Sequence, residues 1–202
     1  MSEKGLLIVV SGPSGVGKGT LCNALVKNID NLFISISATT RPPRTGEVNG
    51  VNYIFMNQEN FEEKIEEGQF LEWAKVYNNY YGTPKEFVIE KLKEGKDVIL
   101  EIDIQGAAQV KKNCPNGVFV FIAPPSLEEL RKRIINRGTD NEESINLRLK
   151  SAKEEMRASF DYDYVIINDD LDKAVLKLQS VILAERCKVS RNKDKILEII
   201  GD

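Results

Sequence analysis

Residues 6–20 read Leu-Leu-Ile-Val-Val-Ser-Gly-Pro-Ser-Gly-Val-Gly-Lys-Gly-Thr. The run 6–10 is short, apolar and unbroken, as a strand buried on both faces of a parallel sheet should be. Residues 12–18 match the pattern G-x-x-x-x-G-K, and we expect a helix directly after them, over about 17–28. This order predicts a phosphate-binding loop, in which backbone N–H groups and a helix N-terminus face phosphate oxygens. A glycine-rich structural turn is the alternative, but the lysine and the flanking elements argue against it.

The loop predicts contacts to a nucleoside triphosphate. Lys18 supplies a mobile positive charge for the β and γ oxygens. The usual pattern places Ser or Thr after this lysine as a Mg²⁺ ligand, whereas here Gly19 comes first and Thr20 second. Either Thr20 binds the metal or water fills that position. The predicted nucleotide contacts of the loop are Gly12, Pro13, Ser14, Gly15, Val16, Gly17, Lys18, Gly19 and Thr20.

The rest of the chain continues to alternate strands with helices. Further runs rich in β-branched residues lie at 33–37, 98–102, 118–122 and 165–167, and helical segments at about 84–94, 107–112, 126–137, 141–159 and 171–189. This order predicts an α/β fold of the P-loop NTPase type, a parallel sheet flanked by helices. The Pro- and Gly-rich stretch 41–82 is predicted to be an inserted α+β unit, because structureless loops of that length are uncommon. A charged helical tail over 190–202 has no assigned role.

Composition excludes several classes of function. The chain has 202 residues, of which 42% are hydrophobic and 29% charged, so we expect one folded domain. There are no histidines, which excludes Ser-His-Asp catalysis and histidine-based zinc sites. Three cysteines without a CxxC pair argue against a thiolate zinc site and fit reduced thiols. The net charge of −3 argues against a broad nucleic-acid surface.

No apolar run is long enough for a signal peptide or a membrane span. We therefore expect a cytoplasmic protein with small-molecule substrates and neither a membrane nor a nucleic-acid partner. The oligomeric state stays open.

Polar residues follow the predicted strands, where ligands bind in open α/β sheets. These residues are Ser37, Glu101, Asp103 and Asn168. Glu101 and Asp103 lie two apart, so we expect them to point to the same side of one strand. Asp103 is a candidate Mg²⁺ ligand, directly or through water; a structural salt bridge is the alternative. Asn168 and the two aspartates after it also fit a helix N-cap, which is compatible with a nucleotide contact.

Arginines occur in clusters that suit phosphate. Arg41 and Arg44 lie three apart, and Arg133 and Arg137 share one helix face at i and i+4. Arg148 lies on the next predicted helix. Arginine binds phosphate in a bidentate manner and neutralises a phosphoryl group in transfer. A solvated surface position is the alternative for each one alone, but the clusters beside a phosphate loop favour function.

Together these motifs resemble the guanylate kinase family. The matching pieces are GPSGVGKGT (12–20), SATTRPPRTGEVNGVNY (37–53), FLEWAKVYNNYYGT (70–83), ILEIDIQG (99–106), FIAPPS (121–126), RIINRGTDNEESINLRL (133–149) and VIINDD (165–170). The second and third pieces are specific to the family, whereas a phosphate loop alone is not. The resemblance implies one domain over 1–202. Its parts would be a core (1–37, 95–126 and 159–202), a subdomain binding the nucleoside monophosphate (38–94) and a lid (127–158).

The resemblance also implies the reaction and its participants. ATP would phosphorylate GMP, with dGMP as a further substrate and Mg²⁺ as cofactor, giving ADP and GDP in purine nucleotide metabolism. The implied GMP contacts are Ser37 and Glu72 on the guanine, Thr83 near the base or phosphate, Arg41, Arg44, Tyr53 and Tyr81 on the phosphate, and Glu101 and Asp103 at the acidic strand end. The implied catalytic residues are Lys18, Arg44, Arg133, Arg137 and Arg148, of which Arg133 and Arg137 also contact ATP. Asn168 would contact its adenine.

Two other readings remain. One is a kinase for AMP, UMP or dTMP, against which Glu72 and the segment 41–53 argue. The other is a protein-binding module of this family that has lost catalysis, against which the intact phosphate loop and arginines argue.

Overall fold

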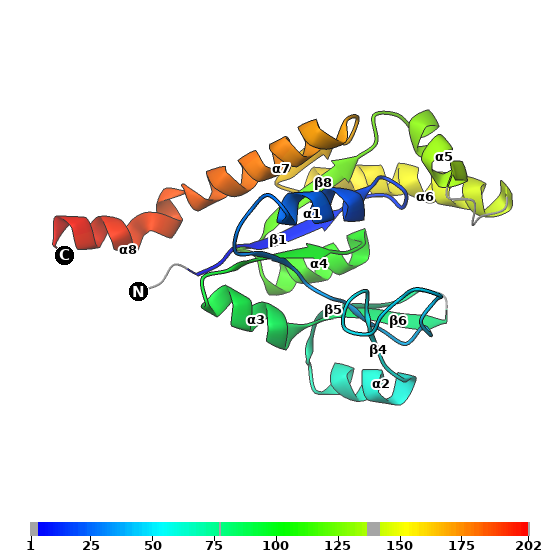
Figure 1. The fold of residues 1–202 in the computed structure, drawn as a ribbon, viewed down its shortest axis with the longest axis horizontal. Helices are drawn as coiled ribbons and strands as arrows, with labels where there is room; N and C mark the ends of the chain where they lie inside the picture. The colour runs from blue at the N-terminus through cyan, green and yellow to red at the C-terminus, as the bar shows by residue number, and fades with distance from the viewer. Residues whose placement is uncertain (1–3, 77, 137–141, 202) are drawn as a thin grey trace.

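The computed structural model describes residues 4–76, 78–136 and 142–201 (Figure 1). Its main sheet has five parallel strands in the order β2–β7–β1–β8–β9. The strands are β1 (Leu7–Ser11), β2 (Leu32–Ile34), β7 (Asp97–Glu101), β8 (Val118–Ala123) and β9 (Tyr164–Ile167). This confirms the predicted α/β fold with a parallel sheet.

Both faces of the main sheet are covered, as the apolar run of β1 predicts. Successive side chains of a strand point to opposite faces. Ile8 and Val10 accordingly join one buried cluster, and Leu7 and Val9 join another. The first cluster includes residues of α1 (Lys18–Val26) and α7 (Leu171–Arg186), and the second includes residues of α3 (Lys85–Lys93) and α4 (Ile104–Asn113). Helices therefore pack on each side of β1 (Figure 1).

A second, smaller sheet confirms the inserted α+β unit. Its strand order is β4–β3–β6–β5. The strands are β3 (Ala38–Thr39), β4 (Ile54–Phe55), β5 (Phe70–Val76) and β6 (Asn79–Pro84), and the helix between β4 and β5 is α2 (Gln58–Glu66). Phe61 of α2 stacks on Phe70 with ring centroids 4.4 Å apart, in a small core of its own. The sequence did not reveal β3, which is too short to show a period, or β6, which contains glycine and ends at a proline.

Three predicted boundaries were wrong at the carboxyl edge of the main sheet. The strand expected over 33–37 ends at Ile34, after which the chain crosses to β3. Strand β7 ends at Glu101, so Asp103 does not share that strand. Instead Asp103 caps α4, because its Oδ1 accepts a hydrogen bond from Gly106 N at 2.8 Å. The helix therefore begins at Ile104, three residues before the predicted start.

The remaining helices follow the predicted order. They are α5 (Leu127–Asn136), α6 (Glu142–Ala158) with a short 3₁₀ turn after it (Ser159–Asp161), and α8 (Val189–Ile200). Ser126 caps the start of α5, since its Oγ accepts a hydrogen bond from Glu129 N at 3.1 Å. The tail is helical as expected, but it is separate from α7 and extends away from the body of the molecule (Figure 1). In the part of the chain that the structure describes, none of the helices combines the length and apolar character needed to cross a membrane.

Candidate active site

Glycines shape the predicted phosphate loop where β1 meets α1. Gly12 has a φ of +145°, and a Cβ atom there would lie 2.2 Å from the carbonyl oxygen of Ile122 on β8. Gly17 is the N-cap of α1 in the left-handed region, with a φ of +94°. A side chain at either position would strain the backbone, so the course of the loop depends on these glycines.

Lys18 lies folded against the loop that precedes it. Its Nζ donates to the carbonyl oxygens of Gly12 at 2.6 Å and Pro13 at 3.2 Å. Burial lowers the pKa of Lys18 below its ordinary value, while the charges of nearby carboxylates act in the opposite direction. These carboxylates belong to Glu101, Glu155 and Asp103. The ammonium group is thus held at the loop in a setting of reduced solvation.

Asn168, at the end of β9, holds the loop from the other side. Its buried side chain donates from Nδ2 to the carbonyl oxygen of Val16 at 2.8 Å. Two residues later, Asp170 caps α7 by accepting from Lys173 N at 2.9 Å. The predicted N-cap is confirmed for Asp170, whereas the side chain of Asn168 is hydrogen-bonded to the backbone of the phosphate loop.

Two arginines from α5 and α6 contact the same loop. Arg133 Nη1 donates to the carbonyl oxygen of Val16 at 3.4 Å, and Arg133 Nε donates to Glu129 at 3.1 Å. Arg148 Nη1 donates to Ser14 Oγ at 3.0 Å. The predicted arginine cluster is therefore assembled for Arg133 and Arg148, while Arg137 lies outside the described residues.

Gly19, where the loop departs from the usual pattern, lies close to the carboxylate of Glu101. A Cβ atom on Gly19 would lie 3.2 and 3.3 Å from the two carboxylate oxygens of Glu101. Glu101 thus stands next to the position where related loops carry a hydroxyl, and Thr20 is exposed on α1. Among the described residues, no three Asp, Glu, Cys or His side chains form a group that could hold a metal.

Glu155 is a site residue that sequence reasoning missed. It belongs to α6, and burial raises the pKa of its half-buried carboxyl, with the charge of Lys18 acting against that rise. Its position in the middle of a charged helix gives no signal in the sequence. Its proximity to Lys18 arises only because α6 packs near the loop.

Glu72 on β5 is a buried carboxylate, only 6% exposed. Thr83 Oγ1 donates to its Oε1 at 2.6 Å. The pKa of Glu72 is raised to about 7, chiefly by burial. The hydrogen bond from Thr83 acts to lower it, and the charge of Asp103 acts to raise it. A Cβ atom on Gly106 would lie 2.6 Å from Oε2 of Glu72, so the Glu72 carboxylate faces the first turn of α4. The predicted pair of Glu72 and Thr83 is thus brought together across the hairpin β5–β6.

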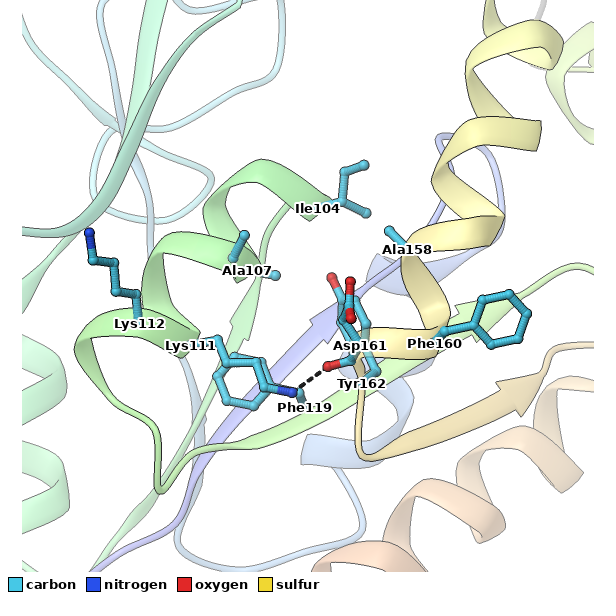
Figure 2. Close-up of a pocket in the computed structure, with 10 residues that line it drawn as sticks. Ile104, Ala107, Lys111, Lys112, Phe119, Ala158, Phe160, Asp161 and Tyr162 are labelled. Atoms are coloured by element: carbon cyan, nitrogen blue, oxygen red, sulfur yellow. Dashed lines mark hydrogen bonds between the residues drawn. The ribbon is translucent and has the colours of Figure 1, made fainter.

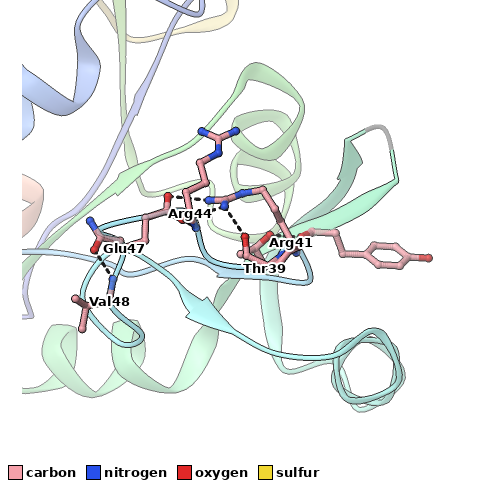
Figure 3. A network of polar contacts seen from close by, with 8 residues as sticks. Thr39, Arg41, Arg44, Glu47 and Val48 are labelled. Atoms are coloured by element: carbon pink, nitrogen blue, oxygen red, sulfur yellow. Dashed lines mark hydrogen bonds and ion pairs between the residues drawn. The ribbon is translucent and has the colours of Figure 1, made fainter. Parts of the chain in front are cut away.

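Arg41 lies in a network of polar contacts (Figure 3), and aromatic rings stand near its guanidinium group. Its Nη1 and Nη2 donate to the two carboxylate oxygens of Glu47, both at 2.9 Å. The guanidinium carbon stands 5.4 Å from the ring centroid of Tyr53, which is 6.1 Å from the ring of Tyr81. The predicted phosphate-binding residues Arg41, Tyr53 and Tyr81 therefore lie together, and Glu47 is an addition to the prediction.

Glu101 and Asp103 connect the two halves of the site. Burial is the largest cause of the pKa shifts of Lys18, Tyr53 and Glu72, lowering the first and raising the other two. The charge of Glu101 acts on Lys18 and Tyr53, and that of Asp103 acts on Lys18 and Glu72. Ser37 lies between β2 and β3, where its carbonyl oxygen accepts from Ile54 N at 2.9 Å. The loop of the main sheet and the second sheet therefore both lie near the carboxylates of Glu101, at the end of β7, and Asp103, at the start of α4.

A cavity of about 620 Å³ lies elsewhere, between α4 and the segment that joins α6 to β9 (Figure 2). Its walls include Ile104, Lys111, Phe119 and Tyr162. None of the site residues predicted from the sequence lines it. The residues of the candidate site lie instead at the loop between β1 and α1, at the end of β7 and on the second sheet.

Comparison with known proteins places the chain. The family model described as "Guanylate kinase" matches residues 4–185. A guanylate kinase of Caldanaerobacter subterraneus subsp. tengcongensis is 60% identical over 199 residues, which cover 98% of this chain and 97% of that protein. One of Clostridium tetani is 60% identical over 195 residues, covering 96% and 93%. The crystal structure of guanylate kinase from Anaplasma phagocytophilum superposes with a TM-score of 0.80 at 34% identity, covering 98% of this chain and 95% of that one. The chain belongs to the guanylate kinase family and is a kinase that binds nucleotides.

Proposed function

We propose that this chain transfers the γ-phosphoryl group of ATP to GMP, and also to dGMP, giving ADP and GDP in purine nucleotide metabolism. Family membership supports the reaction, and the buried Glu72 beside Thr83 is the observation that supports the choice of base. A carboxylate there can accept hydrogen bonds from N1–H and N2–H of guanine together. Adenine offers no such donor pair, and a site built on hydrogen bonds can reject the wrong partner by about 10⁴-fold.

The chemistry needs no general base from the protein. The second pKa of a phosphate monoester is about 6, so GMP is mostly a dianion near neutral pH. One of its oxygens attacks the γ-phosphorus of ATP in line, and the bond to the bridging oxygen of ADP breaks. No proton has to move, which fits a chain without histidine. Catalysis then consists of positioning and charge neutralisation.

Positive charge in this proposal comes from Lys18 and from arginines. Lys18 lies at the loop that would hold the ATP phosphates, and Arg133 and Arg148 already contact that loop. Arg44 and Arg137 complete the proposed catalytic set, and Asn168 would contact the adenine. Segment 127–158 would act as a lid whose closure excludes water, the competing acceptor.

The GMP site would lie on segment 38–94 and at the acidic end of β7. Arg41, Tyr53 and Tyr81 already lie together, which supports a common role on the phosphate. The proposed GMP contacts are Ser37, Arg41, Arg44, Tyr53, Glu72, Tyr81, Thr83, Glu101 and Asp103.

Mg²⁺ is the proposed cofactor. Thr20, and Asp103 directly or through water, would hold it, and bound Mg²⁺ would supply positive charge to offset that of the ATP phosphates. The donors near Lys18 are hard carboxylate oxygens, as this ion prefers. Mg²⁺ usually keeps several waters and is held by few protein groups, so a metal-holding group of three carboxylates is not required.

A coupled assay of ADP formation with five acceptors tests the proposal. The acceptors are GMP, dGMP, AMP, UMP and dTMP, each with ATP and Mg²⁺. We expect turnover with GMP and dGMP at least about 10³-fold faster in kcat/KM than with the other three. Preference for another acceptor would identify a different monophosphate kinase. Absence of product with all five would support a protein-binding module instead.

A further inference from the structure

The geometry points to Glu47 as a positioning residue that orients Arg41 and Arg44 toward the phosphate of the acceptor nucleotide. This inference rests on the proposed function, in which both arginines bind that phosphate. Glu47 itself would not touch the substrate. Its carboxylate holds the guanidinium group of one arginine and the backbone of the other (Figure 3).

A tight turn brings Glu47 back to the arginines. Glu47 N donates to the carbonyl oxygen of Arg44 at 3.0 Å, and Arg44 N donates to Glu47 Oε2 at 2.7 Å. Gly46 lies between them with a φ of +87°, as the third position of a type II turn requires. The two reciprocal hydrogen bonds close the turn, so the direction of the Glu47 side chain is set by the backbone.

The carboxylate of Glu47 then fixes the guanidinium group of Arg41. Both terminal nitrogens of Arg41 donate to Glu47 carboxylate oxygens at 2.9 Å. The side chain of Arg41 is 12% exposed and that of Glu47 is 19% exposed. Arg41 Nη1 also donates to the carbonyl oxygen of Pro42 at 2.7 Å, and the guanidinium group stands near the rings of Tyr53 and Phe55. Because arginine has five N–H donors in a planar fork, pairing along one edge orients the group and leaves donors for a phosphate.

An internal carboxylate affects phosphate binding in two opposite ways. It cancels positive charge near the phosphate, which weakens attraction. It also removes rotamer freedom that Arg41 would otherwise lose on binding, which strengthens association. The ion pair is partly buried and bidentate, and the same carboxylate also accepts a hydrogen bond from Arg44 N. We therefore infer that orientation outweighs the lost charge, so that removing the carboxylate weakens binding.

Glu47→Gln tests this sign, because the amide keeps the size of the side chain but loses its charge and one acceptor. We expect the KM and the calorimetric Kd for GMP to rise roughly tenfold, a typical effect of a hydrogen bond between charged groups. The kcat and the KM for ATP should change by less than about twofold. Guanosine, which lacks the phosphate, should bind both proteins equally. Glu94→Gln is the matched control, since Glu94 accepts from Lys91 and Lys96 outside the proposed site.

A double-mutant cycle shows whether Glu47 acts through Arg41. In an Arg41→Ala background, Glu47→Gln should weaken GMP binding by less than about threefold. An unchanged or tighter Kd for GMP in the single variant would overturn the inference, because charge competition would then dominate. Equal losses for GMP and guanosine would also overturn it, because the defect would not concern the phosphate. If the wild-type protein neither binds nor phosphorylates GMP, the proposed function itself fails.

Discussion

The buried surroundings of Glu72 disfavour the charged form of its carboxyl group. Burial raises the pKa of its carboxyl to about 7 from an ordinary value of 4.5. Between these two values the folded chain binds a proton that the unfolded chain has released. The free energy of unfolding therefore falls as the pH rises from about 4.5 to about 7, and the loss is complete above that range.

We predict that Glu72→Gln removes this pH dependence. The amide still accepts the hydrogen bond of Thr83 but has no charge to bury, so the variant should be more stable than the wild type at pH 8. The difference should be on the order of 2 kcal/mol and should vanish near pH 4.5. Urea unfolding at several pH values measures this difference in stability, and parallel stability profiles of the two proteins would contradict the prediction.

In the acceptor assay, Glu72→Gln should also lose most of the preference for GMP over AMP.

Lys18 is the residue whose removal should slow phosphoryl transfer most directly. Lys18→Ala removes the ammonium group that lies on the loop carbonyls of Gly12 and Pro13. We predict that kcat falls by about 10²–10³-fold, as when one preorganised donor to the developing charge is lost. The Kd for GMP should stay within about threefold, because GMP is proposed to bind other residues. Steady-state rates and a separate GMP titration measure both, with the exposed Lys173→Ala as control; near-normal turnover would refute the role.

At the scale of elements, the loop between β1 and α1 depends on support from β9. Asn168 donates to the carbonyl oxygen of Val16, and Arg133 donates to the same atom. The link joins two segments about 150 residues apart, so no local pattern encodes it. This is why the sequence could suggest a nucleotide contact or a cap for Asn168 but not a bond to the loop.

We predict that Asn168→Ala loosens the loop. Loss of a buried hydrogen bond should lower the free energy of unfolding by about 1–2 kcal/mol and raise the KM for ATP. Asn192→Ala is the matched control, because that amide also donates to backbone carbonyls, those of Arg186 and Lys188, but far from the loop. Thermal or urea unfolding and ATP kinetics compare the two. Equal effects in both variants would show that Asn168 has no particular role in ATP binding.

At the scale of the whole molecule, the C-terminal helices make unequal contributions. Helix α7 buries Leu178 and Ile182, and its last residue, Arg186, donates twice to the buried Asp97 at the start of β7. Asp97 also accepts from Leu6 N at 2.8 Å, so this pair ties the helix to two central strands. Helix α8 has no buried residue.

We therefore predict that a chain ending at Lys188 keeps its fold and its kinase activity. Its free energy of unfolding should stay within about 1 kcal/mol of the full chain, because no core contact is removed. Arg186→Ala should be the more damaging change, by about 3 kcal/mol or more, because it leaves a buried carboxylate unpaired. Circular dichroism melts and the GMP assay compare the two. Loss of activity on truncation would show that α8 has a partner.

Much of this protein could be read from the order of its residues. The alternation of apolar runs and helical segments predicted the parallel sheet, because these periods are local. The glycines and Lys18 predicted the loop for the same reason, and spacing alone paired Arg41 with Arg44. The α+β insertion followed from its composition and length. By contrast, the end of β7, the two-residue β3 and the start of α4 depended on hydrogen bonds to distant or capping groups.

What the site can do chemically was settled only when the chain folded. Glu72 is an ordinary glutamate until α4 and β6 bury it, and only then does its pKa rise. Glu155 comes near Lys18 only because α6 packs toward the loop. Even Glu47, six residues from Arg41, reaches it only through the turn at Gly46. Residue types and spacings determine which elements form, whereas burial and charge are properties of surroundings that distant segments supply.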